Sequence, residues 1–144
     1  MNTLPEDAPR VLIVDDEPDL CELLAITLRG MGLQSDSAGT LVAAKQALTD
    51  ACYRLCLCDL RLPDGSGLEL IEHIQRTQPQ LPVAMITAHG DVRAAVAAMK
   101  AGAFDFVNKP VNVQALRGLI DQALRLSRVR AEPGTAPSLI GDSP

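Results

Sequence analysis

The segment RVLIVDDEPDLCELLAITL, residues 10–28, has the pattern of a strand followed directly by a helix. Its first part is an apolar run of the length that suits a buried strand, and two acids, Asp15 and Asp16, end the run. Pro18 then suits the first turn of a helix, because the fixed φ of proline fits there and its missing N–H would have no partner in any case. Leucines recur at helical spacing up to residue 28. The segment therefore predicts a strand over about residues 10–15 and a helix after it.

The same alternation of strand and helix continues along the chain. Short apolar runs predict further strands, and a polar capping residue precedes most of the helices between them. Five strands that alternate with five helices indicate an α/β fold, a three-layer α/β/α sandwich around a parallel sheet. Right-handed crossovers favour the flavodoxin-like strand order 2-1-3-4-5, which puts the first and third strands side by side. The expected strands cover residues 10–15, 34–38, 54–59, 82–87 and 104–107, and the expected helix caps are Thr40, Ser66, Asp91 and Asn112.

The composition limits the classes of partner. The chain has 144 residues, a net charge of -5 and 47% hydrophobic residues, which suits one acidic globular domain. We expect this segment to bind no nucleic acid, because phosphate binding needs a basic face. We expect no membrane association, since there is no apolar run of about 18 residues, and a cytoplasmic location, because the N-terminus lacks a signal peptide. The four cysteines are expected to be reduced and to act as small apolar core residues.

Composition also divides the chain into parts. Residues 1–9, with two prolines and several polar residues, are expected to form a flexible lead. Residues 10–127 carry the whole pattern of strands and helices and form the expected domain. From residue 128 the chain becomes rich in proline, glycine and charge, which is typical of a linker. Residues 138–144 are expected to begin a further domain.

Five polar or charged side chains fall where the predicted strands end: Asp15, Asp16, Asp59, Thr87 and Lys109. The carboxyl ends of parallel strands share one edge of the sheet, so we expect these residues to meet in one pocket. Three carboxylates repel one another unless a cation lies among them, and Mg2+ prefers such oxygen ligands. A metal ion, a lysine and a hydroxyl around one carboxylate make a site for phosphoryl chemistry. Lys109 would offer its charge, and Thr87 its hydroxyl, to the phosphoryl oxygens.

The carboxylates have different expected roles. Asp59 is the expected nucleophile, because it ends a strand alone and a carboxylate can hold a phosphoryl group as an acyl phosphate. We expect Mg2+ to bind Asp16, Asp59 and the backbone carbonyl of Arg61 directly. Asp15 is expected to bind the ion through water.

The sequence does not decide two features around the pocket, the isomer of one peptide bond and the role of one aromatic residue. The peptide bond between Lys109 and Pro110 can be cis or trans. Phe106, which alternates with Phe104 along the last strand, is either a plain edge aromatic or a switch side chain that moves. His89 is expected to be a loop residue beside the pocket rather than a base.

These residues resemble the receiver domain of two-component response regulators, and the resemblance covers about residues 10–127. It implies that the chain accepts a phosphoryl group from a sensor histidine kinase, with Mg2+ as cofactor, and acts as a switch rather than as an enzyme. The roles that it implies are Asp59 as phosphoacceptor, Asp15 and Asp16 as metal residues, Thr87 and Phe106 as switch pair, and Lys109 as phosphate contact.

Three further motifs resemble the NtrC class of these regulators: LPDGSGLEL at residues 62–70, TAHG at residues 87–90 and KAGAFDF at residues 100–106. Members of that class carry a sigma-54-activating ATPase domain and a DNA-binding domain after the receiver. Residues 139–144 are similar to the opening of that ATPase domain, so the resemblance implies both downstream domains as partners. Within the class, the similarity extends to regulators of type IV pilus genes, although His89 stands where those have a tyrosine.

The alternative function from another class is an Mg2+-dependent aspartyl phosphatase that acts on a small phosphate ester. Such an enzyme needs a second acid two residues after its nucleophile, to protonate the leaving group. Arg61 stands at that position after Asp59, which argues against the phosphatase. A flavodoxin-like cofactor binder would need a phosphate-binding loop after the first strand, and two acids stand there instead.

The last predicted helix indicates a partner surface. Its expected core-facing stripe leaves Leu119 and Leu126 beside it. These leucines either widen the core contact or mark an interface. We expect a homodimer through the helices at about residues 91–102 and 112–127 and the strand between them. The stripe expected to face the core comprises Val113, Leu116, Ile120 and Ala123.

Overall fold

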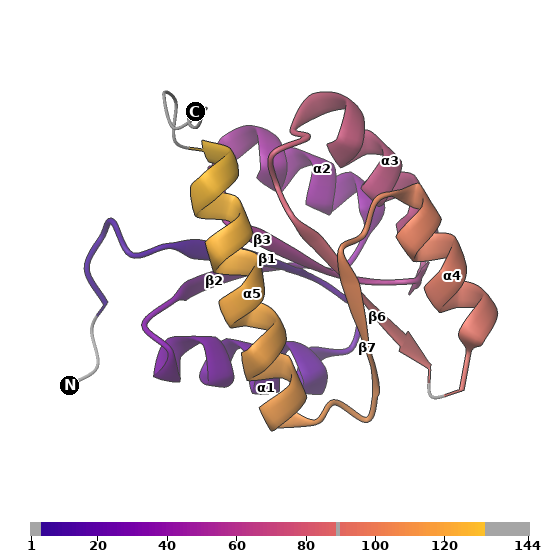
Figure 1. Ribbon diagram of the computed structural model, residues 1–144, viewed down its shortest axis with the longest axis horizontal. Coiled ribbons are helices and arrows are strands. Elements are labelled where there is room, and N and C mark those ends of the chain that lie inside the picture. Colours follow the sequence, from indigo (N-terminus) through magenta and orange to yellow (C-terminus); the bar gives the residue numbers. More distant parts are fainter. Residues whose placement is uncertain (1–3, 89, 132–144) are drawn as a thin grey trace, which may run out of the picture.

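A computed structural model describes residues 4–88 and 90–131 of the chain, with side chains up to residue 126. Five parallel strands form one sheet between two layers of helices, as Figure 1 shows. The predicted three-layer α/β/α sandwich is therefore confirmed. The strands are β1 (Arg10–Val14), β2 (Gln34–Ala38), β3 (Leu55–Asp59), β4 (Arg61–Leu62), β5 (Gly65–Ser66), β6 (Val83–Ala88) and β7 (Asp105–Lys109). The helices are α1 (Pro18–Gly30), α2 (Leu41–Asp50), α3 (Gly67–Thr77), α4 (Val92–Ala101) and α5 (Val113–Ala131).

The order of the strands in the main sheet is β2-β1-β3-β6-β7. This is the predicted order 2-1-3-4-5, because β4 and β5 form a separate small hairpin. In the register of β1 and β3, Val14 pairs with Cys58. Asp15 and Asp59 follow these two residues, so the topology itself brings both acids to the same edge of the sheet.

Each face of the sheet carries its own apolar core. Helices α1 and α5 cover one face, where Leu24 and Ile120 are fully buried against β1, β3 and β6. Helices α2, α3 and α4 cover the other face, where Leu70 and Ile74 are fully buried. Each such side chain contributes about 1.5–3 kcal/mol by leaving water. Aliphatic packing on both faces therefore holds the edge of the sheet in place.

The predicted helix caps are confirmed. Thr40 Oγ1 accepts from Ala43 N, Asp91 Oδ1 from Ala94 N, and Asn112 Oδ1 from Ala115 N. Ser66 and Glu69 form the expected capping box at α3. These caps satisfy backbone N–H groups that have no partner within the helix, and so they fix where each helix begins.

Two details of local structure add to the prediction and one corrects it. Two short strands form the antiparallel hairpin β4–β5 within residues 61–66. Gln34 Nε2 lies within hydrogen-bonding distance of the carbonyl oxygens of Pro5, Glu6 and Ala8, so the lead contacts β2; its flexibility stays a prediction. Helix α5 continues to Ala131, so residues 128–131 extend the helix rather than begin a linker. The expected linker and domain start at residues 132–144 lie outside the described part of the chain.

The expected stripe on α5 also needs correction. Leu119 is 4% exposed and packs in the core of that face, so it is not left over for a partner. Val113, which was assigned to the core, is 39% exposed instead. The larger group of exposed apolar side chains lies on α4 and β7, at Val92, Val96, Met99 and Phe106. In the described residues, no helix is long and apolar enough to cross a membrane.

Candidate functional site: an acidic pocket at the carboxyl edge of the sheet

Three carboxylates meet at the carboxyl ends of β1 and β3. One carboxylate oxygen from each of Asp15, Asp16 and Asp59 can be chosen so that all three lie within 4.8 Å of one another. Asp15 and Asp59 are buried, whereas Asp16 is exposed. The predicted meeting of these residues is therefore present.

Asp15 carries the strongest electrostatic conflict in the pocket. Its Oδ1 accepts a hydrogen bond of 2.9 Å from Glu17 N. Its Oδ2 is buried and is in hydrogen-bonding geometry with no group of the described residues. Burial raises the pKa of Asp15, and the charge of Asp59 adds to this, although Glu17 N and Lys109 lower it. An oxygen in this position favours a cation beside it.

The pocket fits a hard divalent cation. Its possible ligands are carboxylate oxygens, and the described cluster contains no histidine or thiolate. The buried Asp15 Oδ2 makes no hydrogen bond of good geometry with the described residues, although the Lys109 ammonium lies 3.2 Å from it. An acidic pocket of this kind suits Mg2+, which takes a few carboxylates and keeps several waters. Arg61 begins β4, two residues after Asp59. The direct contact of its carbonyl, and the water-mediated role of Asp15, stay predictions.

Lys109 supplies the positive charge of the pocket. Its Nζ lies 3.2 Å from Asp15 Oδ2, 3.3 Å from Asp59 Oδ2 and 2.9 Å from Glu17 Oε2. Burial lowers the pKa of Lys109, but the hydrogen bond to Glu17 and the charges of Asp15 and Asp59 outweigh it, so the pKa is raised. Lys109 is therefore charged at neutral pH. The bond from Lys109 to Pro110, which the sequence left open, is cis.

Sequence reasoning missed Glu17 as part of this pocket. Its position just before Pro18 was explained by the start of α1, and it does occupy the N-cap position. Its side chain, however, makes no capping hydrogen bond there. It points instead to Lys109, a residue 92 positions away in the sequence. Only the fold reveals this contact, since a helix start accounts for an acid at that position equally well.

Thr87 ends in a different environment from the one expected. Its hydroxyl is buried and lies 3.2 Å from Asn108 Oδ1 and 3.5 Å from Val107 O, both on β7. Asn108 was not among the predicted site residues. Its signal in the sequence is weak, because an asparagine beside a lysine and a proline is typical of a turn.

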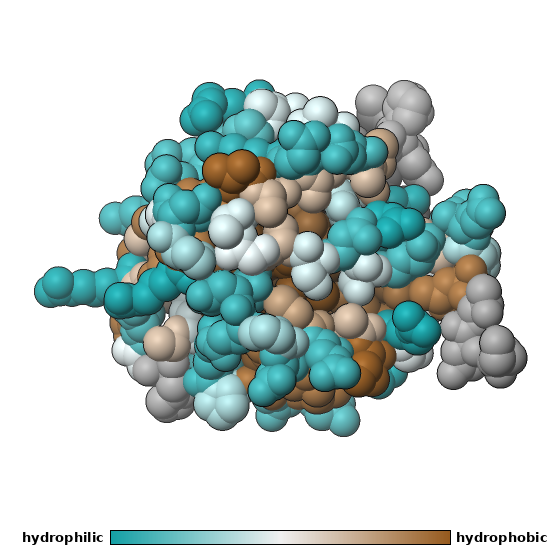
Figure 2. Space-filling view, turned by 180° about the vertical axis from the view of Figure 1, so that it is seen from behind, coloured by the Kyte–Doolittle hydropathy of each residue, from teal (hydrophilic) through white to brown (hydrophobic). Residues whose placement is uncertain are grey.

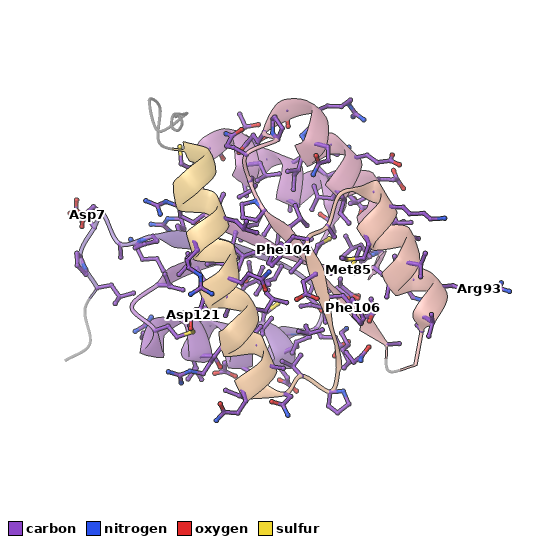
Figure 3. All side chains as sticks on the ribbon, in the orientation of Figure 1. Asp7, Met85, Arg93, Phe104, Phe106 and Asp121 are labelled. Carbon is purple, nitrogen blue, oxygen red and sulfur yellow. The ribbon has the colours of Figure 1, made fainter. Side chains whose placement is uncertain are left out.

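Phe106 and Phe104 lie on different sides of β7. Phe104 packs into the core beneath α1 and α5. Phe106 is 36% exposed and lies on the side of α4, as Figure 3 shows. There it lines an apolar groove of about 540 Å³ together with Val96 and Met99. The expected alternation of the two aromatics along the last strand is wrong, because β7 begins at Asp105 and Phe104 precedes it. His89 lies outside the described residues.

The backbone of Asp59 rests directly on the start of α3. A Cβ added to Gly67 would collide with the Asp59 carbonyl oxygen and touch Cys58 Sγ. Cys58 Sγ lies 3.2 Å from the same oxygen. Burial raises the pKa of Cys58 and, to about 12, that of Cys56, so both are neutral thiols in the core as predicted.

Comparison with known proteins agrees with this geometry. The family model described as "Response regulator receiver domain" matches residues 11–121. The response regulator protein PilR of Pseudomonas aeruginosa is 52% identical over 136 residues, which cover 94% of this chain and 31% of PilR. The nitrogen assimilation regulatory protein NtrX of Azorhizobium caulinodans is 42% identical, over 85% of this chain and 27% of that protein. The chain thus spans less than a third of the length of these relatives.

Solved structures give the same result. The crystal structure of the receiver domain of NtrX from Brucella abortus has a TM-score of 0.76 and 36% identity, and covers 80% of this chain and 98% of that one. A CheY-like receiver domain protein from Methanospirillum hungatei has a TM-score of 0.80 and 27% identity, over 87% of this chain and all of that one. The chain therefore belongs to the response regulator receiver domain family, with PilR and NtrX among its relatives.

Proposed function

We propose that this chain is the phosphorylation-activated receiver of a two-component transcriptional regulator, and that Asp59 accepts the phosphoryl group of a sensor histidine kinase. The observation that supports this most is the placement of Lys109 Nζ, 3.3 Å from Asp59 Oδ2 in a pocket of three carboxylates. A cation beside a carboxylate suits a reaction in which that carboxylate gains three phosphoryl oxygens.

Exposure favours Asp59 over its neighbours as the acceptor. The side chain of Asp15 is 0% exposed, so a donor cannot reach it, whereas that of Asp59 is 11% exposed. Asp16 is exposed but makes no ion pair with Lys109 among the described residues. In the proposed step, an Asp59 oxygen attacks phosphorus, the P–N bond to the donor imidazole breaks, and the imidazole leaves with the bonding electrons. Bound Mg2+ would offset the repulsion between the anionic donor and the carboxylates.

Thr87 and Phe106 are the proposed switch pair. Thr87 Oγ1 is held by Asn108 Oδ1, so it must leave that acceptor in order to donate to a phosphoryl oxygen on Asp59. Phe106 stands two residues before Asn108 on β7, with its ring in the groove beside α4. We propose that the movement of Thr87 draws the ring inward. The groove of α4 and β7 then changes shape and carries the signal.

The downstream function is proposed from the relatives. Because PilR and NtrX are more than three times as long as the matched region, we propose that residues 10–127 act as the receiver of a longer regulator. In it, a linker over about residues 132–137 would follow α5, residues 138–144 would begin a sigma-54-activating ATPase domain, and a DNA-binding domain would come after it. The 52% identity to PilR favours type IV pilus genes as targets. Such a regulator acts in the cytoplasm.

Two surfaces are the proposed docking sites for protein partners. Leu23 and Ile26 are 41% and 63% exposed on α1, the helix that begins next to the acidic pocket. Figure 2 shows apolar surface along the lower edge of the molecule, over α1. We propose that the kinase docks there. The surface of α4, β7 and α5 is the proposed dimer interface, with its apolar contacts supplied by Val96, Met99 and Phe106.

The test is phosphorylation by a small donor. We expect the chain with acetyl phosphate and Mg2+ to gain the mass of one phosphoryl group, and the matched variant Asp59→Asn to gain none. Phosphorylation of the Asn variant would contradict the assignment of Asp59. Repeated turnover of a small aryl phosphate, without accumulation of the phosphorylated chain, would favour the phosphatase.

A further inference from the structure

Asp64 joins two parts of the chain that are separate in the sequence. Its Oδ1 accepts a hydrogen bond of 2.8 Å from Leu41 N, and its Oδ2 accepts one of 3.2 Å from Val42 N. Leu41 and Val42 form the first turn of α2, whereas Asp64 lies in the turn of the β4–β5 hairpin. These hydrogen bonds lower the pKa of Asp64, so the carboxylate is ionised at neutral pH.

Helix α2 does not need Asp64 to begin. Thr40 already occupies the N-cap position and accepts from Ala43 N at 3.0 Å. The carboxylate of Asp64 is thus a second cap of α2, and it comes from the turn of the β4–β5 hairpin, which follows β3. Next to it, a Cβ on Gly65 would collide with the Leu41 side chain, which shows how closely the hairpin is seated on this helix. The contact therefore ties the hairpin to α2 in addition to capping the helix.

The two segments that Asp64 joins, the β4–β5 hairpin and the start of α2, both adjoin the acidic pocket. The hairpin that carries Asp64 begins two residues after Asp59. On the other side, the end of β2, which leads into α2, pairs with the start of the loop of the remaining two acids: Asp15 N donates to Ala38 O at 3.0 Å. A Cβ on Gly39 would lie 4.0 Å from Asp15 O and from the Cα of Asp16. Asp64 therefore connects the two loops that bear the metal-binding carboxylates.

We propose that Asp64 is a positioning residue for the metal site: it sets the spacing between the Asp15–Asp16 loop and the Asp59 loop. The proposal rests on the proposed function only in that the pocket binds Mg2+. Without the tie, the hairpin and the start of α2 separate, and the carboxylates lose the fixed spacing that Mg2+ requires. The ion itself then binds more weakly, although none of its direct ligands has changed.

The experiment compares two caps of the same helix. Mg2+ is titrated into the wild-type chain, Asp64→Ala and Thr40→Ala, and NMR shifts report the dissociation constant, with unfolding midpoints measured in parallel. We expect both variants to have a lower unfolding midpoint than wild type, because each loses a cap of α2. Asp64→Ala should bind Mg2+ about tenfold more weakly, at the lower end of the loss seen when a group that orients metal ligands is removed, whereas Thr40→Ala should stay within about twofold of wild type. Equal Mg2+ affinity in Asp64→Ala and wild type would overturn the proposal.

A third variant separates position from charge. Asp64→Asn keeps one oxygen that can accept from Leu41 N but loses the negative charge. Positioning predicts an affinity between those of wild type and Asp64→Ala, whereas an effect of charge alone predicts the same loss in both variants and would overturn the proposal. A wild-type chain that binds no Mg2+ would instead contradict the proposed function, and this inference with it.

Discussion

Lys109 is closer to Glu17 than to Asp59, the proposed phosphoacceptor: its Nζ lies 2.9 Å from Glu17 Oε2 and 3.3 Å from Asp59 Oδ2. The Glu17 side chain is 59% exposed, so it can move away, whereas Asp59 is fixed at the end of a buried strand. Glu17 therefore competes with an incoming phosphoryl group for the ammonium. In the unphosphorylated pocket, Lys109 is therefore held in place, and the negative charge of Glu17 offsets part of its positive charge.

Replacing Glu17 by glutamine should free this charge. We expect Glu17→Gln to be phosphorylated by acetyl phosphate about two- to fivefold faster than wild type, because a partly exposed ion pair is worth about 0.2–1 kcal/mol. The rate is measured at saturating Mg2+ by quenching the reaction at set times and weighing the chain by mass spectrometry. Asp19→Asn is the matched control, since it removes an acid from the same first turn of α1 without touching Lys109. Equal acceleration in both variants would show that only the overall charge matters.

Asp15 should destabilise the fold when no metal is bound. Its pKa is raised by burial, which means that the fold favours the neutral carboxyl. Stability therefore falls as the pH rises from the ordinary pKa of the carboxyl through the raised one. We expect Asp15→Asn to unfold at a higher temperature than wild type in the absence of Mg2+. Added Mg2+ should raise the midpoint of wild type more than that of the variant.

Calorimetry at pH 7 with and without Mg2+ measures both effects. Asp16→Asn is the comparison, because Asp16 is exposed and its charge conflicts less with the fold. It should leave the metal-free midpoint unchanged while losing the gain from Mg2+. An Asp15→Asn variant that is less stable than wild type without metal would contradict this prediction and show that the ion pair of Asp15 with Lys109 outweighs the cost of burial.

Gly67 should be required by the approach of α3 to Asp59. The Cβ of an alanine would collide with the Asp59 carbonyl, so we expect Gly67→Ala to lose about 1–3 kcal/mol of unfolding free energy. Gly118→Ala is the control, because nothing lies within 4 Å of the added Cβ in α5. It should gain up to about 1 kcal/mol from helix propensity. Urea unfolding of both variants measures the contrast. Equal stability of Gly67→Ala and wild type would mean that α3 can shift away from the acceptor.

The parts of the fold that the sequence predicted are those with a local physical signal. Apolar runs of strand length and polar caps such as Thr40 and Asn112 define the elements, and the order of a parallel sheet then brings Asp15 and Asp59 together. The parts that it missed depend on contacts between distant segments. Glu17 at Lys109 and Asp64 at α2 both have an adequate local explanation, a helix start and a turn, which hides their second contact.

The core-facing stripe of α5 was predicted correctly for Leu116, Ile120 and Ala123, which are fully buried, and wrongly for Val113. A helical stripe fixes only relative angles and leaves open how wide the buried face is. The buried face of α5 also includes Leu119, one of the two alternatives that the sequence left open. The sheet face beneath α5 and the neighbouring α1 decide it.

The burial of Leu119 moves the expected dimer contact from α5 to α4. Val96 and Met99 are 46% and 42% exposed on α4, next to the ring of Phe106, and apolar side chains grouped in this way favour an interface. We expect the chain with Mg2+ and beryllium fluoride, a mimic of the phosphoryl group, to form a dimer in analytical ultracentrifugation.

The variant Val96→Glu/Met99→Glu should remain a monomer, because the dimer would bury two unpaired charges on each side. Val42→Glu places a charge on a more exposed valine of α2, away from this surface, and should dimerise as wild type does. Wild type that stays monomeric with the mimic at hundreds of micromolar would exclude the dimer, whereas a dimeric double variant would put the interface elsewhere on the molecule.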